Sequence, residues 1–551
     1  MKRQLLAALL AAALVLGAAP LFPAARAYSD AAGSWAEPVI EQAREYGLLN
    51  GYPDGSFGVG RSISRGEFVT VLCRMFSWAE VTPDVPSYSD CPLTYWCWAQ
   101  VETALAHGVM DAGAAFRPTD PITREEMAVM LVRALGYGTL AQGLADAALP
   151  FSDVTANRGS IHVAYQIGMT TGVEQGGQLK FLPAATATRE EAAAMLVRVY
   201  ERFASRTEWL HGFYAFSSYS QIGLTARMDA VSVGWARMEY DPQDGPRLNS
   251  TSANGNDWVR PADPAPATDA FEQQGLPYNL NVYASAADRI TLADGSISST
   301  VSALVSTPEA RAAAVAALTE AAANYSGLTM DFEGLKGQAL KADYLTFMTA
   351  LRAALPSGKT LYVCVQPDTW YDGFDYHGLG EVCDKVILMA HDYQWTSVPE
   401  GYVGTANTDS PVTPFSRIYE ALCAITDPQT GVANRSKLAL AISFGTAGFR
   451  IDQEGRLLET TIYHPAQATL AKRLAQPGTQ VTYSERYRNP AAVYTTEDGS
   501  RYRVWYEDAR SVTDKLALAR MFGITGVSLW RLGNIPAYDG YDVWSAVCAT
   551  R

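Results

Sequence analysis

The sequence has few of the residues that hold metals or form redox centres. Its 551 residues include seven cysteines and six histidines, with no C-x-x-C pair and no spacing typical of zinc ligands. Cys364 and Cys383 lie in apolar runs typical of core thiols. Cys91 and Cys97 are close enough in sequence for a disulfide bond, but their spacing alone does not decide whether one forms. We therefore expect no metal centre in this chain.

Positive charge and long apolar stretches are also scarce. The formal net charge is −14, which argues against nucleic acid as a partner, although single arginines can still bind an anionic polymer. After the first residues, no stretch is apolar for long enough to cross a bilayer. The length implies several domains, and the ordinary apolar content permits large cores.

The N-terminal residues carry the one long apolar run. Lys2 and Arg3 precede an apolar stretch from Leu5 to about Leu16, and Ala25-Arg26-Ala27 supplies the small residues of a cleavage site. This pattern predicts a secretory signal peptide over residues 1–27, with an uncleaved N-terminal anchor as the alternative. We expect an exported chain with no membrane insertion after cleavage.

Three segments of similar length resemble one another, and a fixed period of this kind indicates a repeat architecture. Each begins with an aromatic residue followed by Ser-Asp, continues into an amphipathic helix and a Gly-rich turn, and ends in a second helix. We place the repeats at residues 28–87, 88–150 and 151–204. A short signature opens each second helix: Ser64-Arg65-Gly66-Glu67, Thr123-Arg124-Glu125-Glu126 and Thr188-Arg189-Glu190-Glu191.

The signature combines a helix cap with an arginine that helix capping does not explain. Ser or Thr followed three residues later by Glu is a capping box. However, Arg65, Arg124 and Arg189 each follow the cap directly, where the helix dipole disfavours a cation. A helix N-terminus with an added guanidinium is a good anion site. We therefore predict that these arginines bind a ligand, with helix capping alone as the alternative.

Residues 28–204 resemble three S-layer homology domains. By this resemblance they form an α-helical trimer unit that binds secondary cell-wall polysaccharide, with Arg65, Arg124 and Arg189 meeting its carboxylates. The third repeat lacks the tryptophan found at Trp35 and at Trp96 or Trp98. We therefore expect the pocket of the third repeat to depart most from the family.

The second part predicts a different fold. From His211 onward, short β-branched or aromatic runs alternate with Ala-rich helical segments, which indicates parallel strands joined by crossover helices. Residues 205–551 fit an α/β TIM (β/α)8 barrel with an insertion over residues 241–275 and an α+β insertion between strands seven and eight, over residues 446–508. The predicted strands are residues 212–216, 230–235, 278–283, 328–332, 360–366, 385–390, 438–444 and 526–530.

One predicted strand carries two carboxylates at alternate positions. Because alternate residues of a strand face the same side, Thr329, Asp331 and Glu333 should point into the barrel while their neighbours pack outward. Such a pair is costly in an interior but suits the C-terminal mouth, where barrel active sites lie. Mutual repulsion should raise the pKa of one of them, giving an acid beside a charged base. A solvated strand end with two surface acids is the alternative.

This strand resembles the D-G-x-D-x-D-x-E strand of family 18 glycoside hydrolases. Asp331 and Glu333 occupy its last two acidic positions, while Ser326 and Thr329 replace its first two aspartates. Residues 389–393 resemble the family's M-x-Y-D strand end, with His391 in place of tyrosine.

Two further segments carry the resemblance. Residues 526–533 resemble the strand-eight segment whose tryptophan, here Trp530, lies under the sugar. Residues 504–511 are similar to the V-W-F-E-D-A-R-S segment of spore-germination and cortex-lytic glucosaminidases.

The resemblance implies a mechanism and a set of roles. The substrate's own acetamide would be the nucleophile, with Glu333 as general acid and then base, and Asp331 orienting the acetamide. Asp392 would hydrogen-bond the same sugar, Trp530 would stack under it, and no cofactor is needed. Further candidate sugar contacts are His391, Tyr393, Thr329 and Tyr214, with Trp235 and Trp395 as weaker ones.

The sequence thus favours a secreted enzyme attached to the bacterial cell wall or S-layer. We expect a peptidoglycan endo-β-N-acetylglucosaminidase that cleaves β-1,4 linkages by substrate-assisted retaining hydrolysis. A chitinase is the near alternative. A catalytically inactive glycan-binding surface-layer protein and a purely structural surface-layer subunit are the other two.

Overall fold

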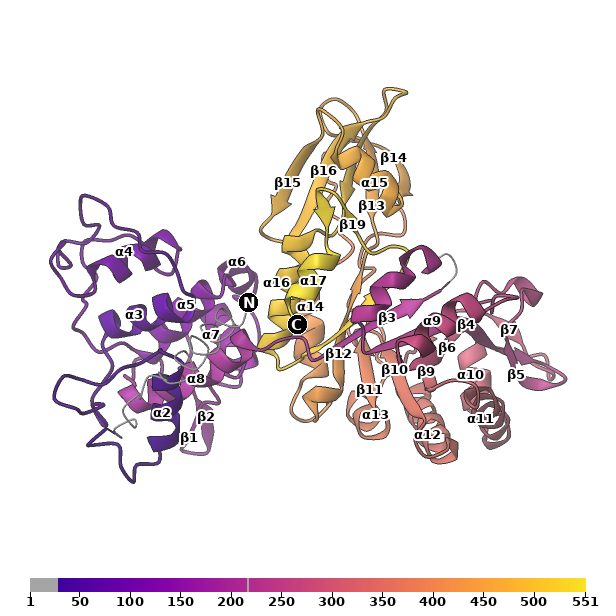
Figure 1. Ribbon diagram of the computed structural model, residues 1–551, viewed down its shortest axis with the longest axis horizontal. Helices are drawn as coiled ribbons and strands as arrows, with labels where there is room; N and C mark the ends of the chain where they lie inside the picture. The colour runs from indigo at the N-terminus through magenta and orange to yellow at the C-terminus, as the bar shows by residue number, and fades with distance from the viewer. Residues whose placement is uncertain (1–27, 216–217) are drawn as a thin grey trace, which may run out of the picture. The chain divides into compact units, whose positions relative to one another are not determined.

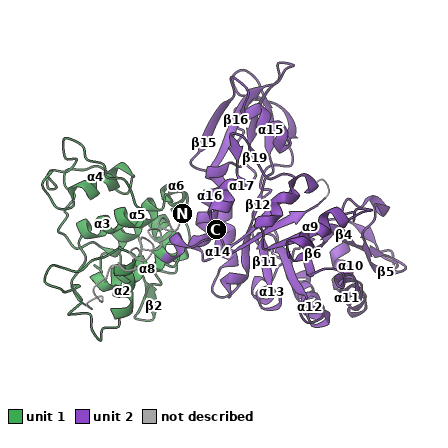
Figure 2. Cartoon of the chain, in the orientation of Figure 1, with its two compact units in different colours: residues 1–200 green, residues 201–551 purple. Residues whose placement is uncertain are grey.

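The computed structural model describes residues 28–215 and 218–551. The predicted signal peptide therefore lies outside the described residues. The chain divides into two compact units, residues 1–200 and 201–551 (Figure 2). Within the described ranges, no helix combines the length and the apolarity that a membrane crossing requires.

Unit 1 consists of short helices, and the second helix of each repeat starts where the capping boxes predict. Ser64 and Thr123 accept the backbone N–H of the third helical residue, whose Glu side chain accepts the N–H of the cap in return. Thr188 and Glu191 exchange the same pair of bonds. The elements are α2 (Glu37–Glu45), α3 (Arg65–Met75), α4 (Trp98–Ala106), α5 (Arg124–Ala134), α6 (Gly138–Gly143), α7 (Arg158–Gln166), α8 (Arg189–Ala204) and the hairpin β1 (Val173–Gln175) and β2 (Gln178–Lys180).

The three repeats of unit 1 close into a ring through equivalent contacts. Each signature arginine donates its Nε–H to the carbonyl of an aromatic residue in another repeat, and its guanidinium lies over the same ring. The Nε–O distances are 2.8 Å for Arg65 to Phe116, 2.8 Å for Arg124 to Phe181 and 2.9 Å for Arg189 to Phe57. Because the third repeat reaches back to the first, the repeats form a cycle and not an open row.

The described part of unit 2 confirms the predicted barrel (Figure 1). Eight parallel strands run in the order β3-β18-β12-β11-β10-β9-β6-β4, and pairing of β3 with β4 closes them into a barrel. They are β3 (Trp209–Tyr214), β4 (Ala230–Asp241), β6 (Tyr278–Ser285), β9 (Gly327–Glu333), β10 (Thr360–Val365), β11 (Lys385–Leu388), β12 (Leu438–Ser443) and β18 (Gly526–Trp530).

The barrel interior contains a buried polar chain that involves the first strand, which starts earlier than predicted. The ring of His211 is fully buried and its two nitrogens hydrogen-bond Ser528 and Ser232, each at 2.8 Å. Ser232 in turn bonds Thr329 at 2.6 Å. Burial lowers the pKa of His211 to about 3, so its ring is neutral. The two serine hydroxyls thus satisfy both ring nitrogens of this buried histidine.

Helices cover the outside of the barrel, and several carry local start signals. Thr307 caps α11 ahead of Pro308, and Asp508 and Ser511 form a reciprocal cap on α16. The helices are η1 (Ser218–Arg227), α9 (Ala265–Gln273), α10 (Thr300–Val305), α11 (Pro308–Ala322), α12 (Gln338–Ala354), α13 (Tyr376–Val382), α14 (Phe415–Ile425), α16 (Ala509–Met521) and α17 (Trp544–Ala549). Short additions are β5 (Gly245–Asn249), η2 (Ala253–Gly255), β7 (Ile290–Thr291), β8 (Ile297–Ser298), η3 (Glu400–Tyr402), η4 (Arg435–Lys437), β19 (Ala537–Tyr538) and β20 (Tyr541–Asp542).

The predicted α+β insertion lies between β12 and β18. It is an antiparallel sheet in the order β14-β13-β17-β16-β15, with one helix. Phe449 and Trp505 anchor its core together with Val398 and Val412 from the loop after β11. The elements are β13 (Ala447–Ile451), β14 (Leu457–Tyr463), α15 (Gln467–Leu474), β15 (Gln480–Ser484), β16 (Asn489–Thr495) and β17 (Arg501–Trp505).

The conspicuous segment at residues 504–511 joins this insertion to the barrel. Glu507 is 2% exposed and accepts from Lys515 Nζ through both oxygens, at 2.6 and 2.7 Å. Asn489, Ser511 and Thr413 donate to the same carboxylate. The segment is therefore a buried junction, and Glu507 is a structural residue.

Candidate active site

The two carboxylates of β9 lie where the alternation predicted. Leu328, Met330 and Phe332 are fully buried, and the Phe332 ring stacks on Phe347 of α12. The opposite set faces inward, because Thr329 bonds Ser232 inside the barrel and Asp331 accepts from Asn281 of β6. Glu333 ends the strand at the C-terminal mouth.

A small pocket opens over this end of the barrel. Its cavity measures about 80 Å³. Glu333, His391 and Asp392 contribute its polar groups, and the pocket is completed by Gln366, Pro367, Trp370, Tyr371 and Met389. The loop after β11 and the loop after β10 thus bring their residues to the carboxylate at the end of β9.

Burial raises the pKa of both carboxyl groups of β9. For Glu333 burial is the largest cause, followed by the negative charges of Asp331 and Asp392, and its pKa rises to about 8. For Asp331 burial also dominates, while Asn281, Cys364 and His391 oppose it, and its pKa rises to about 6. At neutral pH the site therefore holds a protonated Glu333 beside a charged Asp331. Repulsion contributes as expected, but burial outweighs it.

His391 and Asp392 form a pair beside these carboxyls. His391 Nδ1 lies 2.8 Å from Asp392 Oδ2, and the His391 side chain is 7% exposed. Burial acts to raise the pKa of Asp392, but the charge and hydrogen bond of His391, together with the charge of His464 and a hydrogen bond from Gln394, outweigh it, so this pKa is lowered. The other ring nitrogen, Nε2, is buried and has no hydrogen-bond partner among the described residues. It is available to a group that enters the pocket.

Asp331 is held from two neighbouring strands. Asn281 Nδ2 donates to its Oδ2 at 3.2 Å, and the Cys364 thiol lies beside it and stabilises its charge. Its Oδ1 is buried without a partner in the described part of the chain. One oxygen of Asp331 is thus fixed, and the other is left for a ligand.

The structure corrects two of the predicted sugar contacts. Thr329 is fully buried beneath Asp331 and bonded to Ser232, so it cannot reach a sugar. Tyr214 faces outward, where its ring packs edge-on against Phe271 of α9 and Trp235. Both Tyr214 and Trp235 are core residues, because alternate positions of β3 and β4 face the surrounding helices.

The remaining aromatic candidates lie nearer the mouth. Trp530 ends β18, packs edge-on against Phe213 and lies 6.0 Å, ring to ring, from Trp258. Tyr393 lies 4.9 Å from Trp370, a residue of the pocket that is 41% exposed. Trp395 packs instead into the core of the insertion.

Sequence reasoning missed Asn281, Gln366, Trp370 and Trp258. Asn279 and Asn281 alternate within an otherwise apolar strand, which already indicated two inward polar groups. Gln366 ends a predicted strand and accepts from the N–H of Gly334, directly after Glu333, at 2.6 Å. Trp258 lies in the insertion after β4, and nothing in the sequence connected it with Trp530.

The predicted ligand-binding arginines of unit 1 differ from one another in the structure. Arg65 and Arg189 are 9% and 3% exposed, and each forms an ion pair at 2.5 Å, with Glu126 and Glu67 respectively. Arg124 bonds Phe181 O and Thr170 Oγ1 and has no ion pair with a described residue. The contacts that close the ring therefore include an ion pair at Arg65 and at Arg189, but not at Arg124 among the described residues.

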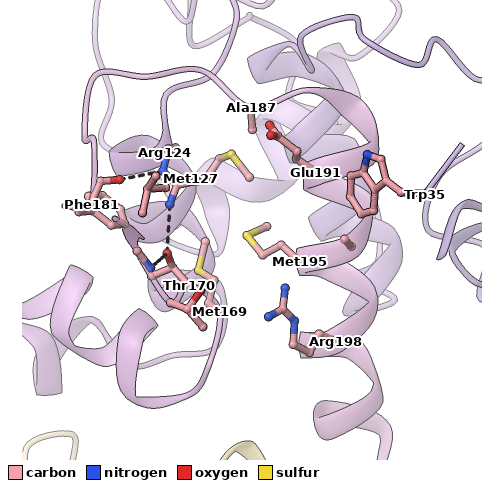
Figure 3. Close-up of a pocket in the computed structure, with 14 residues that line it drawn as sticks. Trp35, Arg124, Met127, Met169, Thr170, Phe181, Ala187, Glu191, Met195 and Arg198 are labelled. Atoms are coloured by element: carbon pink, nitrogen blue, oxygen red, sulfur yellow. Dashed lines mark hydrogen bonds between the residues drawn. The ribbon is translucent and has the colours of Figure 1, made fainter. Parts of the chain in front are cut away.

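Arg124 lines a cavity of about 280 Å³ between the second and third repeats (Figure 3). Figure 3 shows Glu191 and Arg198 of α8 across the cavity, with Trp35 at its edge. Trp35 is 68% exposed. An exposed ring, two cations and one carboxylate thus surround an open space.

A second cavity, of about 460 Å³, is lined in part by Arg189, Tyr52, Glu67, Arg74 and Trp96. It corrects the expectation for the third repeat. Because the repeats form a cycle, Trp35 and Trp96 stand at the cavities of Arg124 and Arg189. The missing tryptophan of the third repeat therefore affects the surroundings of Arg65, not those of Arg189.

Among the described residues, no cluster of His, Cys, Asp or Glu could hold a metal ion. Two family models match the chain. Residues 293–534 match "Glycosyl hydrolases family 18", and residues 27–69 and 87–128 match "S-layer homology domain".

The chain also resembles individual proteins. The "Cortical fragment-lytic enzyme" of Bacillus anthracis is 26% identical over 211 residues, which cover 37% of this chain and 45% of that protein. The "Putative sporulation-specific glycosylase YdhD" of Bacillus subtilis is 27% identical over 215 residues, covering 38% and 47%. The solved spore cortex-lytic enzyme SleL of Bacillus cereus is 17% identical, covers 69% of this chain and 78% of that one, and has a TM-score of 0.47. The chain thus spans a little less than half the length of the curated relatives it matches.

Proposed function

We propose that this chain is a wall-attached peptidoglycan endo-β-N-acetylglucosaminidase, because residues 293–534 match the family 18 glycosyl hydrolase model and residues 27–69 and 87–128 match the S-layer homology model. The observation that carries the proposal is the pair on β9, in which Glu333 has a pKa raised to about 8 next to Asp331. A carboxylic acid that stays protonated at neutral pH is what a leaving glycosidic oxygen requires. The names of the two Bacillus relatives favour a spore or wall glycan over chitin.

The first step follows from these protonation states. Glu333 protonates the glycosidic oxygen while the acetamide oxygen of the same sugar attacks the anomeric carbon, so the leaving group departs as an alcohol. Asp331, held through one oxygen by Asn281, directs its free Oδ1 to the acetamide N–H and stabilises the positive charge of the oxazolinium ion. Glu333, now charged, then takes a proton from water, which attacks the anomeric carbon and restores the acetamide.

His391 has a role that depends on its protonation. If Nδ1–H donates to Asp392, the neutral ring offers only a lone pair at Nε2, and the protonated ring offers an N–H. The acetamide oxygen is an acceptor, so the protonated ring suits it better. Trp530 and Trp370 supply rings for the sugars on either side.

Anchoring belongs to unit 1. We assign the wall-polysaccharide site first to the cavity of Arg124, because its guanidinium has no competing ion pair. An anionic polymer would meet Arg124 and Arg198 and stack on Trp35. The residues predicted at 151–204 would complete the ring as a third repeat. Export rests on the predicted signal peptide.

The test is digestion of purified peptidoglycan and of chitin oligosaccharides by the full chain. We compare it with Glu333→Gln and with Glu320→Gln, an exposed carboxylate of α11. New reducing N-acetylglucosamine ends from peptidoglycan, retained in Glu320→Gln and reduced by about 10²–10⁴-fold in Glu333→Gln, would support the proposal.

The other outcomes separate the alternatives. Products from chitin alone would make the protein a chitinase. Binding to either glycan without any product would make it a glycan-binding surface protein. The chitinase alternative stays open because the 504–511 segment, which favoured peptidoglycan, is buried away from the pocket.

A further inference from the structure

Two of the chain's cysteines meet beneath a surface loop of unit 1. Cys91 and Cys97 are both fully buried, whereas Pro92, Leu93, Thr94 and Trp96 between them are exposed. The structure carries both as thiols, and the side chains of Cys91 and Cys97 are close enough to influence each other's pKa. The surface loop thus begins and ends at a buried cysteine.

Comparison with the other repeats shows that sulfur is not needed at these positions for packing. Cys91 follows Asp90, whose carboxylate accepts backbone N–H groups, and the equivalent residues after Asp30 and Asp153 are Ala31 and Val154. Cys97 follows Trp96 as Ala36 follows Trp35. Ala31 and Ala36 are 2% and 0% exposed, so small apolar residues fill the same places in the first repeat. The second repeat replaces both of them with thiols, at two positions that touch.

We propose that Cys91 and Cys97 form a disulfide bond in the exported protein, which closes the 91–97 loop and fixes Trp96. The sequence spacing left this pairing open, and contact between the two sulfurs is the observation that selects it. Formation is an exchange with a small-molecule or protein disulfide of the oxidising compartment. The two thiols lose two electrons and two protons to form one S–S bond, and the oxidant's S–S bond is cleaved to two thiols.

The bridge would stiffen one wall of the cavity that contains Arg189. Trp96 precedes Cys97, is 57% exposed and lines that cavity with Tyr52 and Glu67. Cys97 Sγ also lies against Gly66, at the start of α3, where an added Cβ would be 2.9 Å from the sulfur. A cross-link here therefore holds the indole between the N-terminal end of α3 and the cavity.

Burial determines when the bond must form. Burial raises the pKa of Cys97 to about 12 and also raises that of Cys91. Thiolate is the reacting form, so oxidation after the loop has closed would be slow. The bond should form while the repeat folds, and it should then resist reductants until the protein unfolds.

The direct test is the thiol count of the full chain secreted into medium. Denatured without reductant and alkylated, it should take up five labels rather than seven, with a Cys91–Cys97 cross-linked peptide in the digest. After reduction it should take up seven. Labelling of both Cys91 and Cys97 without reduction would overturn the proposal.

A second measurement uses the first repeat as a guide to a variant that folds. The double variant C91A/C97A copies Ala31 and Ala36, so it should fold without the bridge. Its unit 1 should melt roughly 5 °C lower than that of the wild type, because a seven-residue loop is no longer closed in the unfolded chain. A reductant should reach the bridge as unit 1 unfolds during the melt, so it should lower the wild-type melting temperature by a similar amount and leave the double variant unchanged. The variant Cys548→Ala, in unit 2, is the control and should keep the response to reductant. A wild-type protein that melts identically with and without reductant would contradict the bridge.

Discussion

At the residue scale, the site shows how one strand gives two carboxyl groups different pKa values. Asp331 and Glu333 face the same side of β9, but Asp331 has Asn281 and Cys364 to stabilise its charge, whereas nothing comparable stabilises that of Glu333. Burial raises the pKa of both, and these unequal neighbours separate the two values. The assignment of acid and charged partner therefore depends on residues of β6 and β10, outside the motif.

The raised pKa of Glu333 predicts a pH-dependent stability. The folded-state pKa of Glu333, about 8, is above the ordinary glutamic acid pKa of 4.5. Between these values the unfolded chain binds fewer protons, so the contribution of Glu333 to stability is fully present below pH 4.5 and is lost as pH rises through 8. Glu333→Gln mimics the protonated form, so its melting temperature relative to wild type should rise from pH 5 to pH 9. A melting-temperature difference between Glu333→Gln and wild type that stays constant from pH 5 to pH 9 would contradict this prediction. The control variant Glu320→Gln should show no change with pH in its own melting-temperature difference from wild type.

Asn281 offers a test of how Asp331 is positioned. Asn281→Ala removes the donor to Oδ2, so the pKa of Asp331 should rise further. The acid limb of the kcat/KM profile should move to higher pH, and kcat at pH 6 should fall about 10- to 100-fold.

Asn279→Ala is the matched control for this variant. Asn279 is buried on the same strand but bonds Leu328 O and Thr360. That variant should lose stability and keep its pH profile. An unshifted acid limb in Asn281→Ala would show that the amide is only structural.

At the scale of elements, the sequence predicted the start of a helix well where the residues that cap it lie next to it in the chain. The three capping boxes predicted helix starts at Arg65, Arg124 and Arg189, which the structure confirms. The first barrel strand begins at Trp209, before its predicted start at residue 212, and its buried His211 is satisfied by Ser232 and Ser528, which are distant in sequence. A short strand with a buried polar residue cannot be judged without its partners.

The junction between the insertion and α16 gives a prediction at this scale. Lys515 and Glu507 are 0% and 1% exposed as side chains, and Lys515→Met would leave Glu507 charged and without its cation. We expect a loss of about 3–5 kcal/mol in the unfolding free energy of unit 2, measured by urea denaturation.

The double variant Glu507→Gln/Lys515→Met separates pairing from packing. It removes both charges, while the Gln carbonyl can still accept from Asn489 and the Gln amide can donate to the Ser511 hydroxyl, which accepts instead of donating. It should recover most of the loss, because no unpaired charge remains. A double variant as unstable as Lys515→Met would show that packing of the lysine chain dominates.

At the scale of the whole molecule, we propose that the repeats use one motif for two purposes. Arg189 is 3% exposed, pairs with Glu67 and reaches Phe57, so it closes the ring. Arg124 closes its own junction through Phe181 but keeps part of its guanidinium toward the cavity of Trp35. Sequence equivalence therefore does not mean functional equivalence.

Two substitutions in the full chain distinguish these purposes. Arg124→Ala should weaken co-sedimentation with purified cell walls, about tenfold, and leave the melting temperature of unit 1 within a few degrees of wild type. Arg189→Ala should lower that melting temperature more, because the ion pair of the buried Arg189 with the partly buried Glu67 and a ring-closing hydrogen bond are lost. Equal wall binding by wild type and Arg124→Ala would remove Arg124 from the proposed site.

The sequence by itself determined the features that depend on neighbours along the chain. The repeat period, the helix caps, the eight strands, and the placing of Asp331 and Glu333 on one side all follow from local hydrogen bonding and from the alternation of a strand. The tertiary structure alone decided which distant side chains meet. It brought Asn281 to Asp331, Lys515 to Glu507, Trp96 to Arg189, and buried Thr329 and Tyr214, since such contacts depend on strand register and ring closure and not on spacing in the chain.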